Sequence, residues 1–260
     1  MSDFELLHRR AWLMRAGLVL LPGLASGPLA RAANSPPRIA PNAVPASRQL
    51  RYEVRGTFAF IPLFADGDLS WRHGPSGYEA RLRLDAGFLG TRERVSTGTI
   101  TPMGLQPLRY TDRSQHQRDT EFDWPHAEAR LARGGTALLD PGTQDLVSLY
   151  IQLACLFAMD AAAPFLPPNG TQMPLPVLGN GKSVERWRLV IQGEETLELP
   201  GGRLRTRKLL RLPEDSDNLG AELWLAPALN WMPARIRLRE GRSSDVDLRW
   251  SQSVTDLTSL

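Results

Sequence analysis

Carboxylate side chains are the residues of this sequence most suited to acid–base chemistry, namely Asp145, Glu194, Glu195 and Glu222. A glycosidase uses two such groups at a fixed separation, one on each side of the scissile bond. Acids are also typical of a β-sheet surface, where Glu195 would face Arg205 across strands. With 31 basic and 28 acidic residues in the chain, cross-strand pairing is the favoured interpretation. We therefore expect Ala in place of Asp145, Glu195 or Glu222 to leave folding unchanged, and a carboxylate-dependent hydrolase of envelope carbohydrate is an alternative.

Other potentially reactive side chains lack the spacing that their chemistry needs. His73, His116 and His126 are not separated by three or four residues, so no pair of them has the spacing of two ligands on one helix face. Cys155 stands among Ala154, Leu156 and Phe157, where a buried thiol has a raised pKa and is inert. The sequence predicts no catalytic residue and no metal site.

Two loops match ligand-binding motifs only in part. Lys182 follows a Gly-Asn-Gly stretch, but Pro176 stands where a phosphate-binding loop needs glycine. Asp215 and Asp217 begin a short acidic loop, which lacks the glutamate that closes a calcium loop at its twelfth position. Both loops are predicted to be turns, and no cofactor is expected.

An alternation of apolar and polar residues runs through most of the chain after position 48. Leu50, Tyr52 and Val54 alternate with charged residues, and Phe58 and Phe60 extend the same apolar face. The pattern returns at 78–84, 184–191, 203–212, 234–238 and 246–250. It predicts a mainly β fold with one large curved antiparallel sheet, either a barrel or a half-barrel, in a single domain over 49–254.

One segment, 144–159, breaks this pattern and is predicted to be a helix. It contains neither Gly nor Pro, and Thr143 suits its N-cap while Asp145 suits the helix dipole in its first turn. Apolar residues surround most of its circumference, which indicates a helix that is buried on most sides. We expect it inside the concave face of the sheet.

A buried helix in a β protein has two explanations. It is permanent core, or it is a lid over a cleft that an apolar or lipidic ligand enters. Ser148 and Gln152 interrupt its apolar surface beside Leu149, and either face the cleft or bond to strand backbone. Trp124 and Trp231 stand beside prolines at strand ends, where the mouth of a cleft is expected. These five residues are the candidate ligand cleft.

The N-terminal segment has the pattern of an export signal. Arg9 and Arg10 precede a short apolar run, and Ala30 and Ala32 have the small-x-small spacing of a cleavage site. Ten apolar residues are too few for a stable membrane anchor. The sequence predicts a cleaved signal peptide over 1–32, of secretory or twin-arginine type, then a flexible leader over 33–48. The processed chain would be periplasmic and, with 27 basic against 26 acidic residues, unsuited to nucleic acid.

Several strings in this order resemble the DUF3108 family of exported bacterial proteins. They occupy 107–110, 122–124, 143–148, 193–197, 200–202, 222–227 and 231–237. The resemblance implies an exported β-rich protein, similar at fold level to envelope carriers that hold lipid in a half-barrel. It implies no catalytic residue. The leading hypothesis is a non-enzymatic periplasmic protein with an apolar or lipidic ligand, and the alternative is an envelope interaction or scaffold protein.

Overall fold

A computed structural model describes residues 39–254 apart from 59, 163–166, 180–182 and 213–218. From Ile39 onward these residues belong to one compact unit. The export-signal residues Arg9, Arg10, Ala30 and Ala32 lie outside the described residues. So do Lys182 and the acidic loop that begins at Asp215.

The N-terminal half of the unit is a meander of strands, each antiparallel to the one before it. Its strands are β1 (Arg48–Phe58), β2 (Ile61–Gly74), β3 (Gly77–Asp85), β4 (Thr91–Thr101), β5 (Gly104–Arg113), β6 (Gln117–Asp123), β7 (Glu128–Arg130) and β8 (Thr136–Leu138). Short 3-10 turns η1 (Pro41–Ala43) and η2 (Gly87–Leu89) precede β1 and β4 respectively.

A second meander follows the helix α1 (Ser148–Ala162). Its strands are β9 (Gln172–Val177), β10 (Glu185–Leu199), β11 (Gly202–Leu212), β12 (Leu219–Leu225), β13 (Pro233–Glu240) and β14 (Ser244–Val254), with a 3-10 turn η3 (Pro227–Leu229). The last strand pairs antiparallel with β1 and so joins the two meanders into one sheet.

Within the described residues the sheet has 14 strands in the order β8-β7-β6-β5-β4-β3-β2-β1-β14-β13-β12-β11-β10-β9. The prediction of a mainly β fold with one large curved antiparallel sheet is confirmed, and of its two forms the described sheet has the open one rather than the closed barrel. The edge strands explain this. The first edge, β8, is only three residues long, and β9 carries Pro174 and Pro176, which have no N–H to donate to a further strand.

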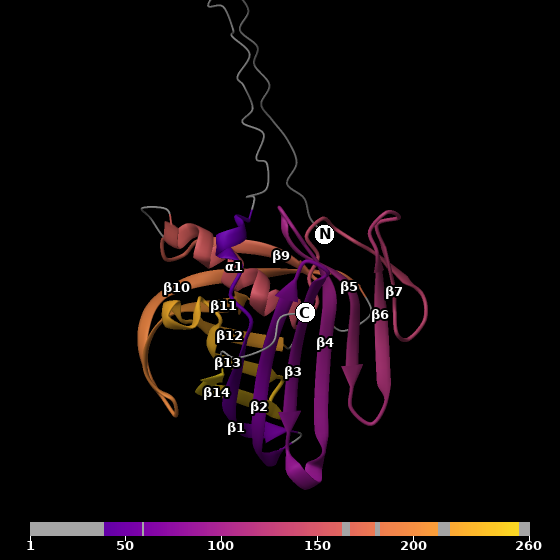
Figure 1. Cartoon of the computed structure of the whole chain (residues 1–260). Helices are drawn as coiled ribbons and strands as arrows, with labels where there is room; N and C mark the ends of the chain where they lie inside the picture. The colour runs from indigo at the N-terminus through magenta and orange to yellow at the C-terminus, as the bar shows by residue number, and fades with distance from the viewer. Residues whose placement is uncertain (1–38, 59, 163–166, 180–182, 213–218, 255–260) are drawn as a thin grey trace, which may run out of the picture. The chain divides into compact units, whose positions relative to one another are not determined.

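The sheet is strongly curved, and Figure 1 shows its two meanders crossing at a steep angle with α1 beside them. Register shifts interrupt the β1–β14, β4–β5, β10–β11 and β12–β13 pairs, and such bulges bend a sheet. The long β10–β11 hairpin curls until Gly201 N–H donates to Trp250 O on β14 at 3.1 Å. A Cβ on Gly201 would lie 2.6 Å from the Trp250 ring, so only glycine permits this approach.

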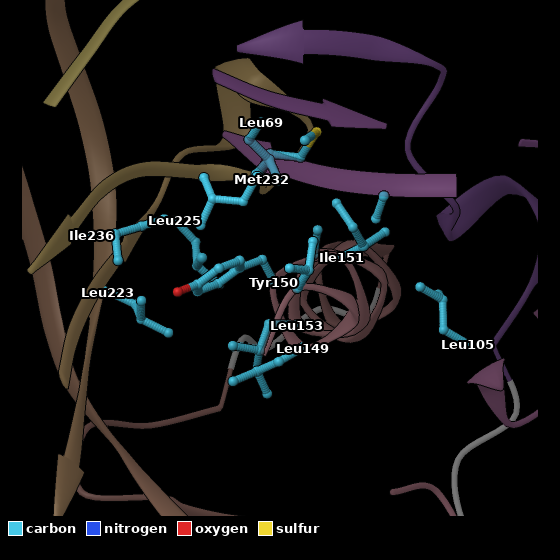
Figure 2. Close-up of a cluster of buried hydrophobic side chains, with 14 of the residues drawn as sticks. Leu69, Leu105, Leu149, Tyr150, Ile151, Leu153, Leu223, Leu225, Met232 and Ile236 are labelled. Atoms are coloured by element: carbon cyan, nitrogen blue, oxygen red, sulfur yellow. The ribbon is translucent and has the colours of Figure 1, made fainter. Parts of the chain in front are cut away.

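The core lies where α1 packs between the meanders. Figure 2 shows α1 end-on, with Leu149, Tyr150, Ile151 and Leu153 directed toward side chains from several strands. Those side chains are Leu69 of β2, Leu105 of β5, Leu223 and Leu225 of β12, and Ile236 of β13. All of them are at most 4% exposed. The prediction of one buried helix is confirmed, although the helix spans Ser148–Ala162 rather than 144–159.

Part of the expected leader packs on this core. Ile39 and Ala43 are buried, and Ile39 N–H donates to Pro102 O at 2.6 Å. Each of these buried apolar side chains gains the free energy of leaving water, which favours packing of this part of the leader on the core. No helix among the described residues is long and apolar enough to cross a membrane.

Candidate functional site

Asp145 caps the N-terminus of α1. Its Oδ1 accepts hydrogen bonds from the N–H groups of Val147 and Ser148, both at 2.8 Å. Ser148 Oγ in turn accepts from the Asp145 N–H at 2.9 Å, so two residues satisfy each other's backbone donors. The predicted N-cap, Thr143, instead donates its hydroxyl to Asp140 O at 2.7 Å. Both the Oγ and the backbone N–H of Ser148 are thus hydrogen-bonded to Asp145 at the N-terminus of α1.

The Asp145 carboxyl is fully buried and joins a polar cluster across the core. Ser96 Oγ on β4 donates to Asp145 Oδ2 at 2.5 Å, and Tyr78 OH lies 3.0 Å from the same Ser96 oxygen. Burial raises the pKa of Asp145 despite the hydrogen bonds it accepts from Ser96, Ser148 and Val147. The cluster ties α1 to β3 and β4.

Gln152 binds strand backbone, one of the two alternatives open from the sequence. Its Oε1 accepts from Leu105 N–H at 2.9 Å, and Gln144 Nε2 donates to Leu105 O at 2.9 Å. A Cβ on Gly104, whose φ is +114°, would lie 2.2 Å from Gln152 Oε1. Two glutamines thus hold the start of β5 against α1, and glycine before Leu105 makes this possible.

Leu149 and Trp231 lie in the same core. Leu149 is 1% exposed, and the Trp231 ring packs on Phe157 of α1 with centroids 5.5 Å apart. Trp231 has a left-handed backbone, φ +61°, a conformation that is unfavourable for a bulky side chain and is offset here by burial. A ligand-binding role for Ser148, Leu149, Gln152 and Trp231 stays a prediction.

Trp124 occupies a different place, in an open groove of about 510 Å³ on the first meander. The half-buried indole stacks near Phe122, with centroids 6.2 Å apart, and donates from Nε1 to Pro107 O at 2.6 Å. The groove is lined by β4, β5, β6, the turn after β6, and β7, through Thr99, Gln106, Leu108, Arg109, Glu121, Phe122, Asp123, Trp124, Pro125 and Arg130. Trp124 is the one candidate cleft residue that lines it.

The rim of this groove, which we call the Trp124 groove, carries both signs of charge. Arg130 pairs with Glu121 at 2.8 Å, and Arg109 pairs with Asp119 at 2.9 Å. Although burial opposes it, hydrogen bonds from Thr111, Gln117 and Arg109 lower the pKa of Asp119 to about 2. Four apolar and six polar or charged residues line the groove, a mixture that suits a ligand with one apolar and one polar end.

The remaining candidate carboxylates lie on the second meander, where Glu194 pairs with Arg205 at 2.8 Å. Glu195 and Glu222 both contact Lys208 Nζ, at 3.9 and 2.8 Å. Burial of Glu222 by itself would raise the pKa of its carboxyl, but the hydrogen bond and the charge of Lys208 lower it. Trp224 Nε1 donates to Glu195 at 2.8 Å, and the Lys208 ammonium lies 4.8 Å from that ring. These contacts form a cross-strand charge ladder, while Asp145 lies inside the core.

The histidines and the cysteine have structural neighbours. His126 Nδ1 lies 2.9 Å from Asp123 Oδ1 and lowers the pKa of that carboxyl, and His73 stacks on Trp71 at 5.4 Å. Burial raises the pKa of the Cys155 thiol to about 12. Among the described residues no three metal-ligating side chains come together.

Sequence reasoning missed Leu108, Arg109 and Arg130 as neighbours of Trp124. The pairing of β5 with β6 and of β6 with β7 brings them together, through Arg109 opposite Glu121 and Glu121 opposite Arg130. Such registers are set by strand pairing rather than by local spacing. One local signal was present, since Leu108 and Arg109 belong to the string 107–110, one of the strings that resemble the family.

Comparison with known structures identifies the fold. A β-barrel-like protein of DUF1849 from Brucella abortus matches with a TM-score of 0.56 at 9% identity, over 80% of this chain and 97% of that one. MucB in complex with MucA(peri) gives a TM-score of 0.35 at 14% identity, over 85% of this chain and 54% of that one. The Pseudomonas aeruginosa MucA/MucB complex gives 0.32 at 13% identity, over 86% and 56%. The chain thus spans about half the length of MucB.

Sequence comparison gives the family. No curated protein matches the sequence. The family model described as "Protein of unknown function (DUF3108)" matches residues 55–242, which extends from β1 to the turn after β13. This agrees with the resemblance found in the sequence strings. The chain belongs to the DUF3108 family.

Proposed function

We propose that this protein is an exported, non-enzymatic binding protein of the cell envelope, which holds a lipidic ligand in the Trp124 groove. The observation that carries the proposal is the groove itself, about 510 Å³ in volume and open at the surface. Its volume falls within the range of small-molecule sites, which are mostly apolar with a few placed polar groups. Leu108 and Trp124 would hold the apolar chain, and Arg109, Glu121 and Arg130 would bind a polar head.

Export is supported by the sequence. Arg9-Arg10, the short apolar run and the Ala30-x-Ala32 spacing together have the features that export machinery and signal peptidase read. Periplasmic localisation of the processed chain follows from this proposal.

The non-enzymatic part is supported by the partners of the candidate acids. Asp145 caps α1 in the core, and Glu195 and Glu222 share Lys208 on another part of the sheet. A two-carboxylate mechanism needs an acid and a second carboxylate on opposite faces of one substrate. The hydrolase alternative therefore has less support than binding.

The test is calorimetric titration with lysophosphatidylcholine of 12-carbon chain length, kept below its critical micelle concentration. We expect saturable binding that Trp124→Leu weakens at least tenfold. Trp250→Leu is the matched control, because Trp250 is also half-buried, donates from Nε1 to Ser253 Oγ at 3.1 Å, and does not line the groove. Glycerophosphocholine, which lacks the chain, should not bind. Equal affinity of the two variants, or no binding by wild type, would contradict the groove and favour the interaction alternative.

A further inference from the structure

The turns at one end of the sheet form an edge that we call the hairpin-tip edge. The β1–β2 turn connects the paired residues Phe58 and Ile61, and the β3–β4 turn connects Asp85 and Thr91. The β13–β14 turn belongs to the same edge, since Phe60 N–H donates to Ser243 O at 2.9 Å. In Figure 1 these turns lie toward the lower ends of β1 to β4.

Exposed apolar side chains gather on this edge. Phe58, Phe60 and Ile61 are 56%, 76% and 55% exposed, and Phe64 and Phe88 reach 72% and 98%. They are five of the eight large apolar side chains that are exposed in the described part of the chain. Phe64 and Gly87 line the same surface hollow, and Gly87 is the residue before Phe88. Phe64 of β2 therefore lies near η2. The register places Phe58 and Ile61 on one face of the sheet and Phe64 on the other, so the exposed apolar side chains surround this end of the sheet. Scattered apolar residues are normal, but a group of five at one end of a sheet marks an interaction surface.

Folding stability does not account for these residues. Phe60 has a left-handed backbone, φ +67°, which strains a bulky residue, and at 76% exposure its ring regains little by burial. Trp231 adopts the same conformation but packs against Phe157. Glycine or asparagine would fit the Phe60 position better on local grounds. Phe88, between Gly87 and Gly90, is even more exposed.

Most acids at this edge pair with arginines, whereas Asp66, in the hollow beside Phe64, has no ion pair within the described residues. Asp85 pairs with Arg83 at 3.0 Å and Glu93 with Arg113 at 3.2 Å. Asp112 pairs with Arg92 at 2.6 Å and with Arg94 at 3.5 Å.

Two turns beside the apolar ones add cations. Arg242 stands in the β13–β14 turn, and Arg118 stands on β6 beside the β5–β6 turn. Within the described residues the structure gives no ion pair for either one. Apolar turns flanked by free cations complement a bilayer with anionic headgroups, because the rings enter the acyl boundary while the arginines meet phosphates.

We propose that the hairpin-tip edge docks this protein on an anionic lipid bilayer, with Phe58, Phe60, Ile61, Phe64 and Phe88 in the interface. These side chains come from the end of β1 and the β1–β2 turn, from the start of β2 and from η2, and they lie on both faces of the sheet, so they fit a fluid surface that closes around each one. This docking is independent of the Trp124 groove.

The experiment is co-sedimentation of the full chain with vesicles of phosphatidylethanolamine and phosphatidylglycerol at 3:1. Phe60→Ser with Phe88→Ser should lower the partition coefficient at least tenfold. The matched control is Met103→Ser with Leu138→Ser, which removes two exposed apolar side chains, 45% and 78% exposed, from other turns and strands. It should change partitioning less than twofold. All chains share one N-terminus, so its contribution cancels.

Two further variants separate docking from folding and from charge. Phe60→Gly should lower partitioning while the melting temperature stays equal or rises, since the strain at this position is relieved. Arg118→Gln with Arg242→Gln should weaken binding to these vesicles at least threefold and leave weak binding to pure phosphatidylcholine unchanged.

Three outcomes would overturn the proposal. One is wild type that does not sediment with vesicles. Another is equal partitioning of the Phe60/Phe88 variant and its control. The third is a concentration-dependent dimer that the Phe60/Phe88 substitutions dissociate, which would assign the edge to a second copy.

Discussion

Asp145→Ala and Asp145→Asn should have opposite consequences for stability. The Ala variant loses the acceptor for two N–H groups at the start of α1 and for the buried Ser96 hydroxyl. Loss of an N-cap costs about 1 kcal/mol, and a buried donor without a partner costs about 1–3 kcal/mol. We expect Asp145→Ala to lower the free energy of unfolding by about 2–4 kcal/mol, or the melting temperature by roughly 4–16 °C.

The Asn variant keeps the capping acceptor and removes the buried charge. Because burial raises the pKa of Asp145, the carboxyl binds its proton more tightly in the native state than in the unfolded state. The contribution of the Asp145 carboxyl to stability is therefore complete below the ordinary aspartate pKa of about 4. It is lost as the pH rises through the raised pKa of this carboxyl in the native state. The Asp145→Asn variant has no such loss, so its free energy of unfolding should increase relative to that of wild type as the pH rises from about 4.

Urea unfolding followed by tryptophan fluorescence, repeated across a pH series, measures both effects. Glu198→Ala is the control, because Glu198 is an exposed carboxylate that pairs with Arg203 at 3.3 Å on the surface. Glu198→Ala should shift the midpoint of urea unfolding little. The capping argument would be refuted if Asp145→Ala were as stable as wild type. The burial argument would be refuted if the stability of wild type and that of Asp145→Asn changed in parallel with pH.

Three other changes and one thiol measurement have expected outcomes. Leu149→Ala should cost about 2–5 kcal/mol in urea unfolding, because it leaves a cavity in the core. Gln152→Leu should cost about 1–3 kcal/mol, since a buried backbone N–H loses its acceptor. With its pKa raised to about 12, Cys155 should resist Ellman's reagent at pH 8 in the native protein and react fully in urea. Arg9→Lys with Arg10→Lys should block processing if export is of twin-arginine type and permit it if the signal is secretory, as immunoblots of cell fractions would show.

The architecture was predictable where a local pattern has one structural meaning. Alternation at 78–84 and 203–212 matches β3 and β11 closely, and the apolar circumference of 144–159 indicated α1. The cap was harder, because Thr143 and Asp145 both suit an N-cap. The structure decides between them, because the Thr143 hydroxyl donates to Asp140 O while the Asp145 carboxyl caps α1 and also accepts from Ser96 across the core. Because the Asp145 carboxyl accepts hydrogen bonds at the start of α1, we now expect Asp145→Ala to destabilise the fold rather than to leave it unchanged.

The candidate site was predictable only in part. Trp124 was identified as a residue of a cleft mouth because it precedes a proline at a strand end. Its neighbours Arg109 and Arg130 lie far apart in the chain and meet through two strand registers. Local spacing contains no information on such registers, which depend on the packing of both faces of the sheet.

The largest departure from the sequence pattern concerns the first strand. Alternation correctly places Leu50, Val54 and Phe58 in one row, yet their exposed fractions are 0%, 2% and 56%. A period of two predicts which face a side chain is on, but burial also requires a covering layer at that height of the sheet. That cover ends before the hairpin-tip edge, since Phe60 and Ile61 are exposed as well. An apolar row that continues past its own core has no role in the fold, and this is the physical ground for assigning that end of the sheet to a surface outside the protein.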